Sequence, residues 1–152
     1  MQRLSSLMFL ALLLVGFNAR CCDAIRVTMT TPAKHSRGIA PVFMVSITNL
    51  TEHPVKLINV VSRQDLKDNY AELSVRQNGQ LVGVPYISDP GPISEKDYVF
   101  LPAGQKISFG HKGTPFSLES LPVGMYQATL RFTMPDLIHV VQSNTVAFTV
   151  IP

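Results

Sequence analysis

The chain has 152 residues, with 13 Lys and Arg against 10 Asp and Glu, two cysteines and no tryptophan. Its net charge of +3 comes from scattered residues, without a basic stripe interleaved with aromatics, so the composition excludes the usual signature of nucleic-acid binding. The length fits one domain behind a short leader, and a domain of this size buries enough surface to fold without disulfides.

The first 24 residues have the pattern of a secretory signal peptide. A charged start, Met1–Arg3, is followed by an uninterrupted apolar run, LMFLALLLV, at residues 7–15. A membrane span needs about 20 apolar residues, so this run predicts a leader and not a stable span. We expect cleavage after Ala24, which makes residues 1–24 the signal peptide and residues 25–152 a mature domain in a secreted or periplasmic location.

Both cysteines, Cys21 and Cys22, lie in this leader, and cleavage after Ala24 removes them. The alternative is lipid attachment at one of the two. A lipidated cysteine follows a small residue, whereas Arg20 precedes Cys21, so we expect no lipid anchor. A retained pair is a further alternative, but a disulfide between sequence neighbours is strained, and two adjacent thiolates alone make a poor metal site.

The rest of the chain alternates between apolar and polar residues with a period of two. In VFMVSIT (42–48) and MYQATLRFTM (125–134) every second side chain is apolar, which predicts strands with one buried face. Only SRQDLKDN (62–69) has any helical character. The pattern predicts an all-β domain with strands near 25–31, 41–49, 55–61, 70–77, 80–86, 97–101, 105–110, 125–134 and 144–151.

Turn residues separate these strands. Asn78-Gly79 predicts a tight type I′ hairpin, because both central residues of that turn need a positive φ. Tyr126 follows the turn LPVG (121–124) at the start of a long alternating strand. This arrangement predicts a tyrosine corner, in which the hydroxyl bonds to backbone a few residues upstream. The alternative is an ordinary half-buried tyrosine at a strand end.

Three segments together resemble small secreted immunoglobulin-like domains: SITNLTEHPVKL (46–57), LPAGQKISF (101–109) and LPVGMYQATLRF (121–132). The resemblance is at the level of the superfamily. It implies an antiparallel immunoglobulin-like β-sandwich of about seven to nine strands, and it brings no functional residue with it. The Cys-Trp-Cys signature of antibody domains is absent.

Strand reversal assigns each loop to one end of such a sandwich. One end should gather residues 50–54, 78–79, 102–104 and 135–143, and the other 32–40, 62–69, 87–96 and 111–124. His53 and His139 then share the first end, and His35 and His111 the second. Two imidazoles hold copper or zinc when a third ligand converges, and Met134 is a candidate thioether at the first end.

No recognised metal-binding pattern surrounds the histidines. We therefore expect solvated loop histidines and no cofactor, with His53 and His139 as the remaining metal candidates. Met134 is equally explained as a core residue of its strand.

Catalytic motifs are absent from the sequence. The predicted mature chain has no cysteine nucleophile, no G-x-S-x-G elbow, no phosphate-binding loop and no dinucleotide fingerprint. The loop carboxylates are expected to be solvated turn residues: Asp65, Asp68, Asp89, Glu95, Asp97 and Asp136. We therefore expect a protein that is not an enzyme.

Two longer loops are the candidates for binding a protein partner. In MPDLIHVVQSN (134–144), Leu137, Ile138, Val140 and Val141 are more apolar than a loop requires, which indicates an exposed anchor in a polar frame. The alternative is that these residues form an edge strand or enter the core. The other candidate, ISDPGPISEKDY (87–98), is polar and is braced by Pro90 and Pro92.

The sequence thus favours a non-catalytic protein-binding module that acts through end loops or a sheet edge. A secreted hydrolase inhibitor that uses the 87–98 loop is the second hypothesis, and a copper or zinc carrier is the third. Asn49-Leu50-Thr51 is also an N-glycosylation sequon, which a eukaryotic host would use at a turn.

Overall fold

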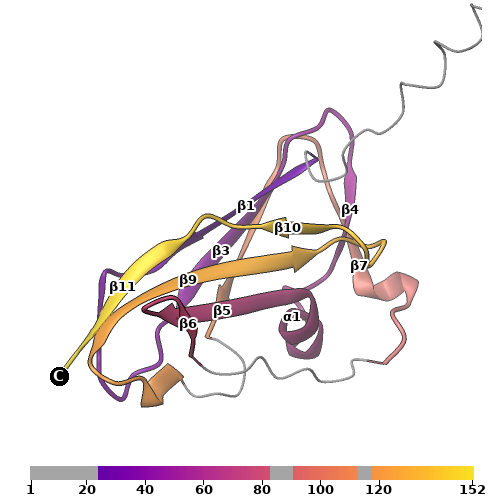
Figure 1. The fold of residues 1–152 in the computed structure, drawn as a ribbon. Helices are drawn as coiled ribbons and strands as arrows, with labels where there is room; N and C mark the ends of the chain where they lie inside the picture. Colours follow the sequence, from indigo (N-terminus) through magenta and orange to yellow (C-terminus); the bar gives the residue numbers. More distant parts are fainter. Residues whose placement is uncertain (1–23, 83–90, 113–117) are drawn as a thin grey trace, which may run out of the picture.

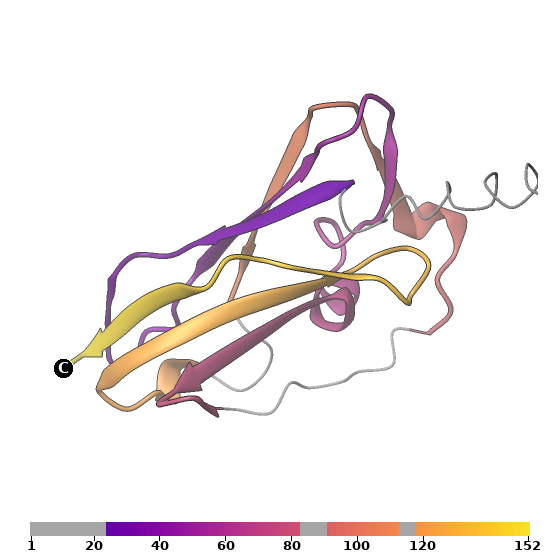
Figure 2. The ribbon, with the colours of Figure 1, turned by 45° about the horizontal axis from the view of Figure 1, so that its top comes forward.

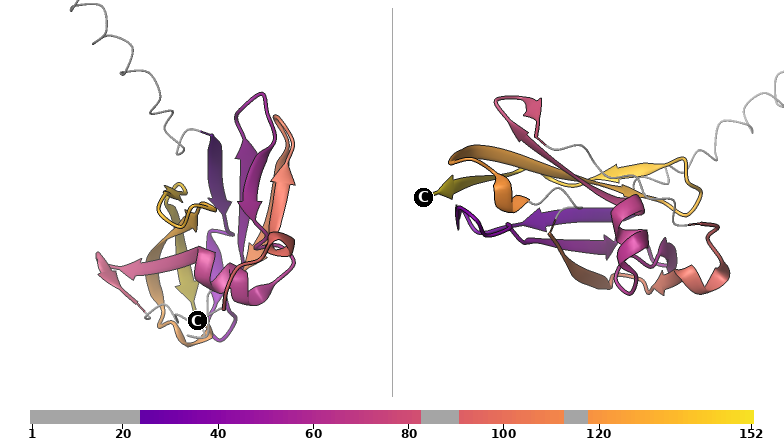
Figure 3. Two further views of the ribbon diagram at one scale, coloured as in Figure 1. Left: turned by 90° about the vertical axis from the view of Figure 1, so that its right-hand side faces the viewer. Right: turned by 90° about the horizontal axis from the view of Figure 1, so that it is seen from below.

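The alternating segments form strands that pack as two layers in the computed structural model (Figures 1 and 3). The structure describes residues 24–82, 91–112 and 118–152. One layer is a three-stranded antiparallel sheet in the order β1 (Ile25–Thr30), β3 (Phe43–Asn49) and β8 (Lys106–His111). β1 shows the expected alternation, since Ile25, Val27 and Met29 are buried and the residues between them are exposed.

The second layer is a larger sheet built around β9 (Gly124–Thr133). Its order is β2 (Lys34–Ser36), β11 (Val146–Ile151), β9, β5 (Ala71–Gln77) and β6 (Gln80–Leu81). β10 (Val140–Gln142) pairs with the C-terminal end of β9. It lies along the same edge of β9 as β11, which pairs with the N-terminal part of that strand. A separate ribbon pairs β4 (Val55–Ile58) with β7 (Tyr98–Leu101). The helix α1 (Gln64–Tyr70) precedes β5, and two single turns of 3-10 helix, η2 (Glu95–Asp97) and η3 (Leu118–Ser120), complete the described elements.

Aromatic rings from both layers meet in the core. The Phe148 ring of β11 packs edge-on against Phe43 of β3 at 5.5 Å between centroids, and it stacks on Tyr126 of β9 at 5.4 Å. Asn144 also joins the layers. Its side chain accepts from the backbone N–H of Met29 and donates to the Met29 carbonyl, at 2.8 and 3.0 Å. The expected all-β sandwich is therefore confirmed, and its strand pairs are antiparallel except that of β2 with β11, which is parallel.

Both turn predictions are confirmed. Asn78 and Gly79 have φ values of 50° and 78°, as a type I′ turn requires. The Tyr126 hydroxyl donates a hydrogen bond of 2.7 Å to the Pro122 carbonyl, which is the bond that defines a tyrosine corner.

Several expected loops contain regular structure. Residues 64–70 form α1, which buries Leu66 and packs Tyr70 against the core. The expected loops at 32–40 and 135–143 contain β2 and β10. These short strands pair with the edges of the second sheet and satisfy backbone groups there. The alternation of side chains does not predict such pairing.

The assignment of the Asn78-Gly79 turn to the end that holds residues 50–54 is wrong. Figure 1 shows this turn at the end of the sandwich where the chain terminates, and it lines a hollow with Ala33 and Met125. The expected alternation fails because β4 stops at Ile58. The segment that follows, including α1, then brings the chain back so that β5 starts at the end where β3 finishes.

Several predictions fall outside the described residues: the leader with Cys21 and Cys22, Pro90, and part of the expected strand at 80–86. Within the part of the chain that the structure describes, no helix has the length and hydropathy needed to span a bilayer.

Candidate functional site

The turn that joins β9 to β10, here called the hairpin tip (residues 134–139), lies at the end of the second sheet opposite the C-terminus (Figures 1 and 2). Backbone bonds close it, since the Met134 N–H donates to the His139 carbonyl and the Leu137 N–H donates to the Met134 carbonyl, both at 2.9 Å. The tip is therefore a defined turn with its own hydrogen bonds.

The Asp136 side chain organises this turn. One carboxylate oxygen accepts from the backbone N–H groups of Ile138 and His139 at 3.0 and 2.9 Å, and the other accepts from the His139 ring. These bonds, first the His139 backbone bond and then its ring, lower the pKa of Asp136 to about 2, because they favour the charged carboxylate. A carboxylate that satisfies three donors fixes the residues on either side of Leu137.

Two apolar side chains extend from the tip into solvent. Leu137 is 54% exposed and Ile138 is 80% exposed. Leu137 also has a φ of 59°, in the left-handed region that residues with a Cβ rarely adopt. A leucine in this conformation costs about 1–2 kcal/mol relative to the right-handed region. Sequence patterning alone gives no signal for that strain.

The structure divides the four apolar residues that the sequence singles out. Val140 and Val141 are partly buried in β10, and Val141 packs against the core. Met134, the copper candidate, is 2% exposed and belongs to the core. Leu137 and Ile138 alone form the exposed pair, with Asp136 and His139 as polar neighbours.

The proline-braced loop is described only from Gly91 onward, where Pro92 is exposed. A polar network holds the segment that follows. Asp97 accepts from the backbone and hydroxyl of Ser94 at 2.8 and 2.7 Å, and it pairs with the Arg63 guanidinium, which also binds Asp65. The bonds from Ser94, then that from Arg63, lower the pKa of Asp97 to about 2.

The expectation that Asp97 is a solvated turn residue is wrong, since it is 2% exposed. The expectation that His111 is a solvated loop histidine is also wrong. His111 is the last residue of β8, is 1% exposed and shares a 2.8 Å hydrogen bond with the Ala71 carbonyl of β5. Burial lowers the pKa of His111, so the ring is held neutral between the two sheets.

The other histidines have surroundings of their own. The His35 ring packs edge-on against Phe148 at 5.5 Å and shares a 3.1 Å bond with the Thr31 hydroxyl. His139 is bonded to Asp136, and His53 lies in the exposed turn after β3. Among the described residues, no three His, Cys, Asp or Glu side chains converge as metal ligands.

Asn49, the sequon residue, is 1% exposed. Its amide nitrogen donates to the carbonyls of His53, Leu101 and Pro102 at 2.7–3.1 Å, and its oxygen accepts from the backbone and hydroxyl of Thr51 at 2.8 Å. A glycan on that nitrogen would displace bonds that join two turns. In the folded domain the sequon residues therefore act as structural hydrogen-bonding groups.

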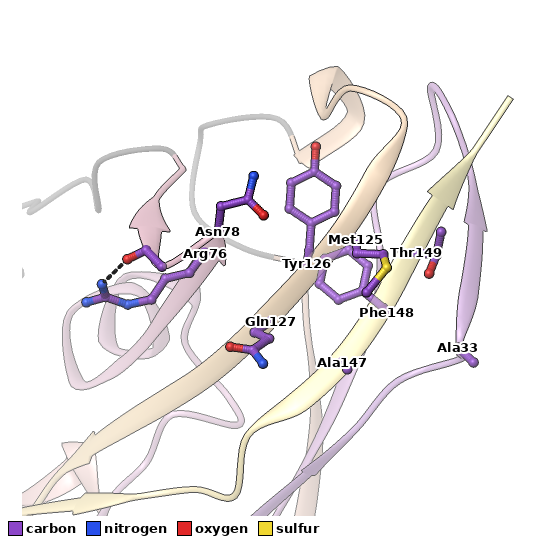
Figure 4. Close-up of a pocket in the computed structure, with 10 residues that line it drawn as sticks. Ala33, Arg76, Asn78, Met125, Tyr126, Gln127, Ala147, Phe148 and Thr149 are labelled. Atoms are coloured by element: carbon purple, nitrogen blue, oxygen red, sulfur yellow. Dashed lines mark hydrogen bonds between the residues drawn. The ribbon is translucent and has the colours of Figure 1, made fainter.

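Two hollows lie on the solvent-facing side of the second sheet. The larger, about 520 Å³, is drawn in Figure 4 and includes Arg76, Met125, Gln127 and Ala147 in its lining. The second, about 390 Å³, shares Arg76 and Gln127 with it and extends over Ser74 and Thr129. This face has no signal in the sequence, because its residues are the ordinary polar positions of alternating strands.

Comparisons with known proteins give no family. No family model matches the chain, and no curated protein matches it. Among solved structures, the chain is similar to the CARDB domain of a Pyrococcus furiosus protein, with 15% identity, a TM-score of 0.40 and coverage of 84% of this chain and 94% of that one. It is also similar to part of a Listeria innocua β-glucosidase, with 12% identity, a TM-score of 0.43 and coverage of 84% of this chain and 16% of the enzyme. These values give this chain no activity, ligand or partner.

Proposed function

We propose that this chain is a secreted or periplasmic, non-catalytic module that binds a protein through the hairpin tip. The observation that supports this proposal is an exposed Leu-Ile pair on a turn where the leucine adopts a strained backbone conformation. A strained backbone conformation persists where surrounding bonds hold it in place, and such conformations are concentrated at binding and switch regions. An apolar pair fixed before binding also loses less conformational entropy when it meets a partner.

Each residue of the proposed site has a distinct role. Leu137 and Ile138 are the anchors that enter an apolar pocket of the partner, and Asp136 and His139 form the polar rim around them. Val140 and Val141 support the anchors by holding β10 on β9. The proposal thus keeps all four apolar residues of the segment in the site, two as contacts and two as support.

A photoreactive side chain at the tip tests this proposal. We would place a photo-crosslinking residue at position 138, and in a matched control at Met44, which is 48% exposed on β3 of the other sheet. In the secreted fraction of the native host, position 138 should give a discrete crosslinked protein that position 44 does not give. Adding Leu137→Asn should abolish that product, whereas equal labelling from both positions would rule out the tip as the anchor.

The proposed location depends on the leader. Intact mass of the protein from its native host should match a chain that starts at Ile25. A mass that starts at Cys21 or Cys22 with acyl chains added would instead make this an anchored domain, and its partners would be sought at a membrane surface.

A second candidate function is inhibition of a hydrolase by the segment that includes Pro92. The bonds from Ser94 and Arg63 to Asp97 favour it, because inhibitory loops need a rigid backbone. A panel of proteases tests it, and no inhibition across the panel would remove this candidate.

A further inference from the structure

The solvent-facing side of the second sheet orders its side chains in rows that cross the strands. Strand register places Glu72, Arg131 and Gln142 opposite one another on β5, β9 and β10. The next row contains Ser74 opposite Thr129. The third row is Leu81, Arg76, Gln127 and Ala147, on β6, β5, β9 and β11.

The middle row has short side chains, and the rows on either side have long ones, apart from Ala147 at the end of the third row. Same-face residues repeat every two positions, so adjacent rows are about 7 Å apart and the two long rows about 13 Å apart. The result is a trough with a hydroxyl floor that runs across the strands, and the 390 Å³ hollow occupies it. Thr145, which precedes β11, also lines it.

The chemistry of this trough suits a ligand that is rich in hydroxyl groups. Among the described residues that line it, Leu81 is the one apolar member, and the others supply two guanidinium groups, a carboxylate, two amides and three hydroxyls. The ladder backbone at the centre of the face is already paired, so a peptide cannot bind here by adding a strand. Adjacent strands are about 4.8 Å apart, which is close to the length of one pyranose unit and longer than the 3.3 Å repeat of an extended peptide.

Charge narrows the class of ligand. Arg76 donates to the Gly79 carbonyl at 2.9 Å (Figure 4), and in the part of the chain that the structure describes it has no carboxylate partner. Arg131 lies 3.6 Å from Glu72, and both side chains are at least one-third exposed, so this pair contributes little and opens easily. The trough therefore carries a net positive charge that a carboxylate would complement.

The neighbouring 520 Å³ hollow continues the same surface. Arg76 and Gln127 line both hollows, and Met125, which is 76% exposed, and Ala147 add an apolar patch beside them. Sugar rings present C–H faces as well as hydroxyls, so a polar trough beside a small apolar patch matches both parts of a saccharide.

We propose that this trough binds an acidic oligosaccharide across the strands of the second sheet. Arg76 and Arg131 bind its carboxylates, and Gln127, Gln142 and the hydroxyl floor bind its ring hydroxyls. The site is separate from the hairpin tip, so it stands or fails independently of the proposed protein-binding function.

Titration of the purified protein with three six-unit probes tests the proposal, and binding is measured by amide chemical shifts and by calorimetry. The probes are a galacturonic acid hexamer, a neutral β-1,4-linked glucose hexamer and hexaglutamate. The acidic sugar should bind with Kd below about 1 mM and shift amides of β5, β9 and β10, and the other two should bind at least about tenfold more weakly. No binding of the acidic sugar overturns the proposal, and equally tight binding of hexaglutamate overturns it by showing attraction to charge alone.

Matched variants locate the site. Arg76→Gln should weaken binding of the acidic hexamer about tenfold or more, because it removes a charge-assisted hydrogen bond, and Thr129→Val should weaken it about threefold to tenfold. Arg26→Gln and Thr28→Val make the same changes on exposed positions of β1 in the other sheet, and they should leave binding unchanged. Equal losses from the β1 variants would overturn the assignment to this face.

Discussion

The turn after β3 and the hairpin tip after β9 are each organised by one polar side chain, but the two side chains bond to different parts of the chain. Asn49 reaches across to the carbonyls of Leu101 and Pro102, some fifty positions away, and is buried. Asp136 bonds only within the next three residues and lies at the surface. The first side chain therefore holds the sandwich together, whereas the second holds a local shape that presents Leu137 and Ile138.

This difference makes the two turns separable by mutation. Changes at the Asn49 turn should alter the free energy of unfolding of the whole domain. Changes at the hairpin tip should alter binding and local exchange without lowering the stability of the domain.

The largest effect is expected from Asn49→Ala. It leaves the buried carbonyl of Leu101 without its donor and removes the acceptor of the Thr51 N–H, which should lower the free energy of unfolding by about 3 kcal/mol. Urea denaturation measures it. Asn144→Ala is the matched control, because the Asn144 side chain also bonds two backbone groups but is exposed. It should lower the free energy of unfolding by about 1 kcal/mol. A cost below about 1 kcal/mol for Asn49→Ala would remove the contrast between the two turns.

A second loss of global stability should appear on acidification, through His111. Its folded pKa lies below the ordinary value of 6.5, so the unfolded state binds the proton first as pH falls. The contribution of neutral His111 is fully present above pH 6.5 and is lost as pH falls from there toward the folded pKa. Nearby charges act in opposite directions, since Asp68 raises this pKa and Lys67 lowers it.

Denaturation at pH 7.5, 6.5 and 5.5 measures this dependence. His111→Gln keeps an amide that can donate to the Ala71 carbonyl and does not titrate, so the variant should lose stability less steeply over this range. The same slope in the variant and in the original chain would assign the pH dependence to other groups.

A smaller effect of opposite sign is expected from Leu137→Asn. Asparagine tolerates the left-handed region better than leucine, so the free energy of unfolding should rise by up to about 1 kcal/mol. The same change should abolish crosslinking from position 138. Thermal unfolding measures the gain in stability, and the crosslinking assay measures the loss of binding. A stabilised variant that still binds its partner would argue against Leu137 as an anchor.

The smallest global effect is expected from Asp136→Ala. Melting should change little, because the bonds of Asp136 stay within the tip, but amide exchange at Ile138 and His139 should accelerate. The matched comparison is Asn49→Ala, which should accelerate exchange across the domain. If Asp136→Ala lowers the melting temperature as much as Asn49→Ala, the tip unfolds together with the core and is not a locally stabilised turn.

Much of the fold follows from local patterns. Alternation located the long strands, and Asn78-Gly79 and Tyr126 identified a hairpin and a tyrosine corner from a few adjacent residues each. The short strand β2 was not found, because it pairs with β11, which lies more than one hundred residues along the chain. The helix α1 lies in the one segment with helical character, 62–69, and β10 matches the edge-strand alternative for the apolar residues of 134–144. The candidate site was found in part: the sequence located the apolar segment, and the structure separated Leu137 and Ile138 from Val140 and Val141.

The sequence by itself determined the all-β class, the main strands and the type of their turns, since those depend on the stereochemistry of adjacent residues. Only the tertiary structure decided which polar residues are buried, as with Asn49, Asp97 and His111. It also decided that Leu137 adopts a left-handed backbone, and that polar side chains of three strands, β5, β9 and β10, align into rows. The rows depend on the register between β5 and β9, which pairs residues more than fifty positions apart, and packing of the two sheets sets that register.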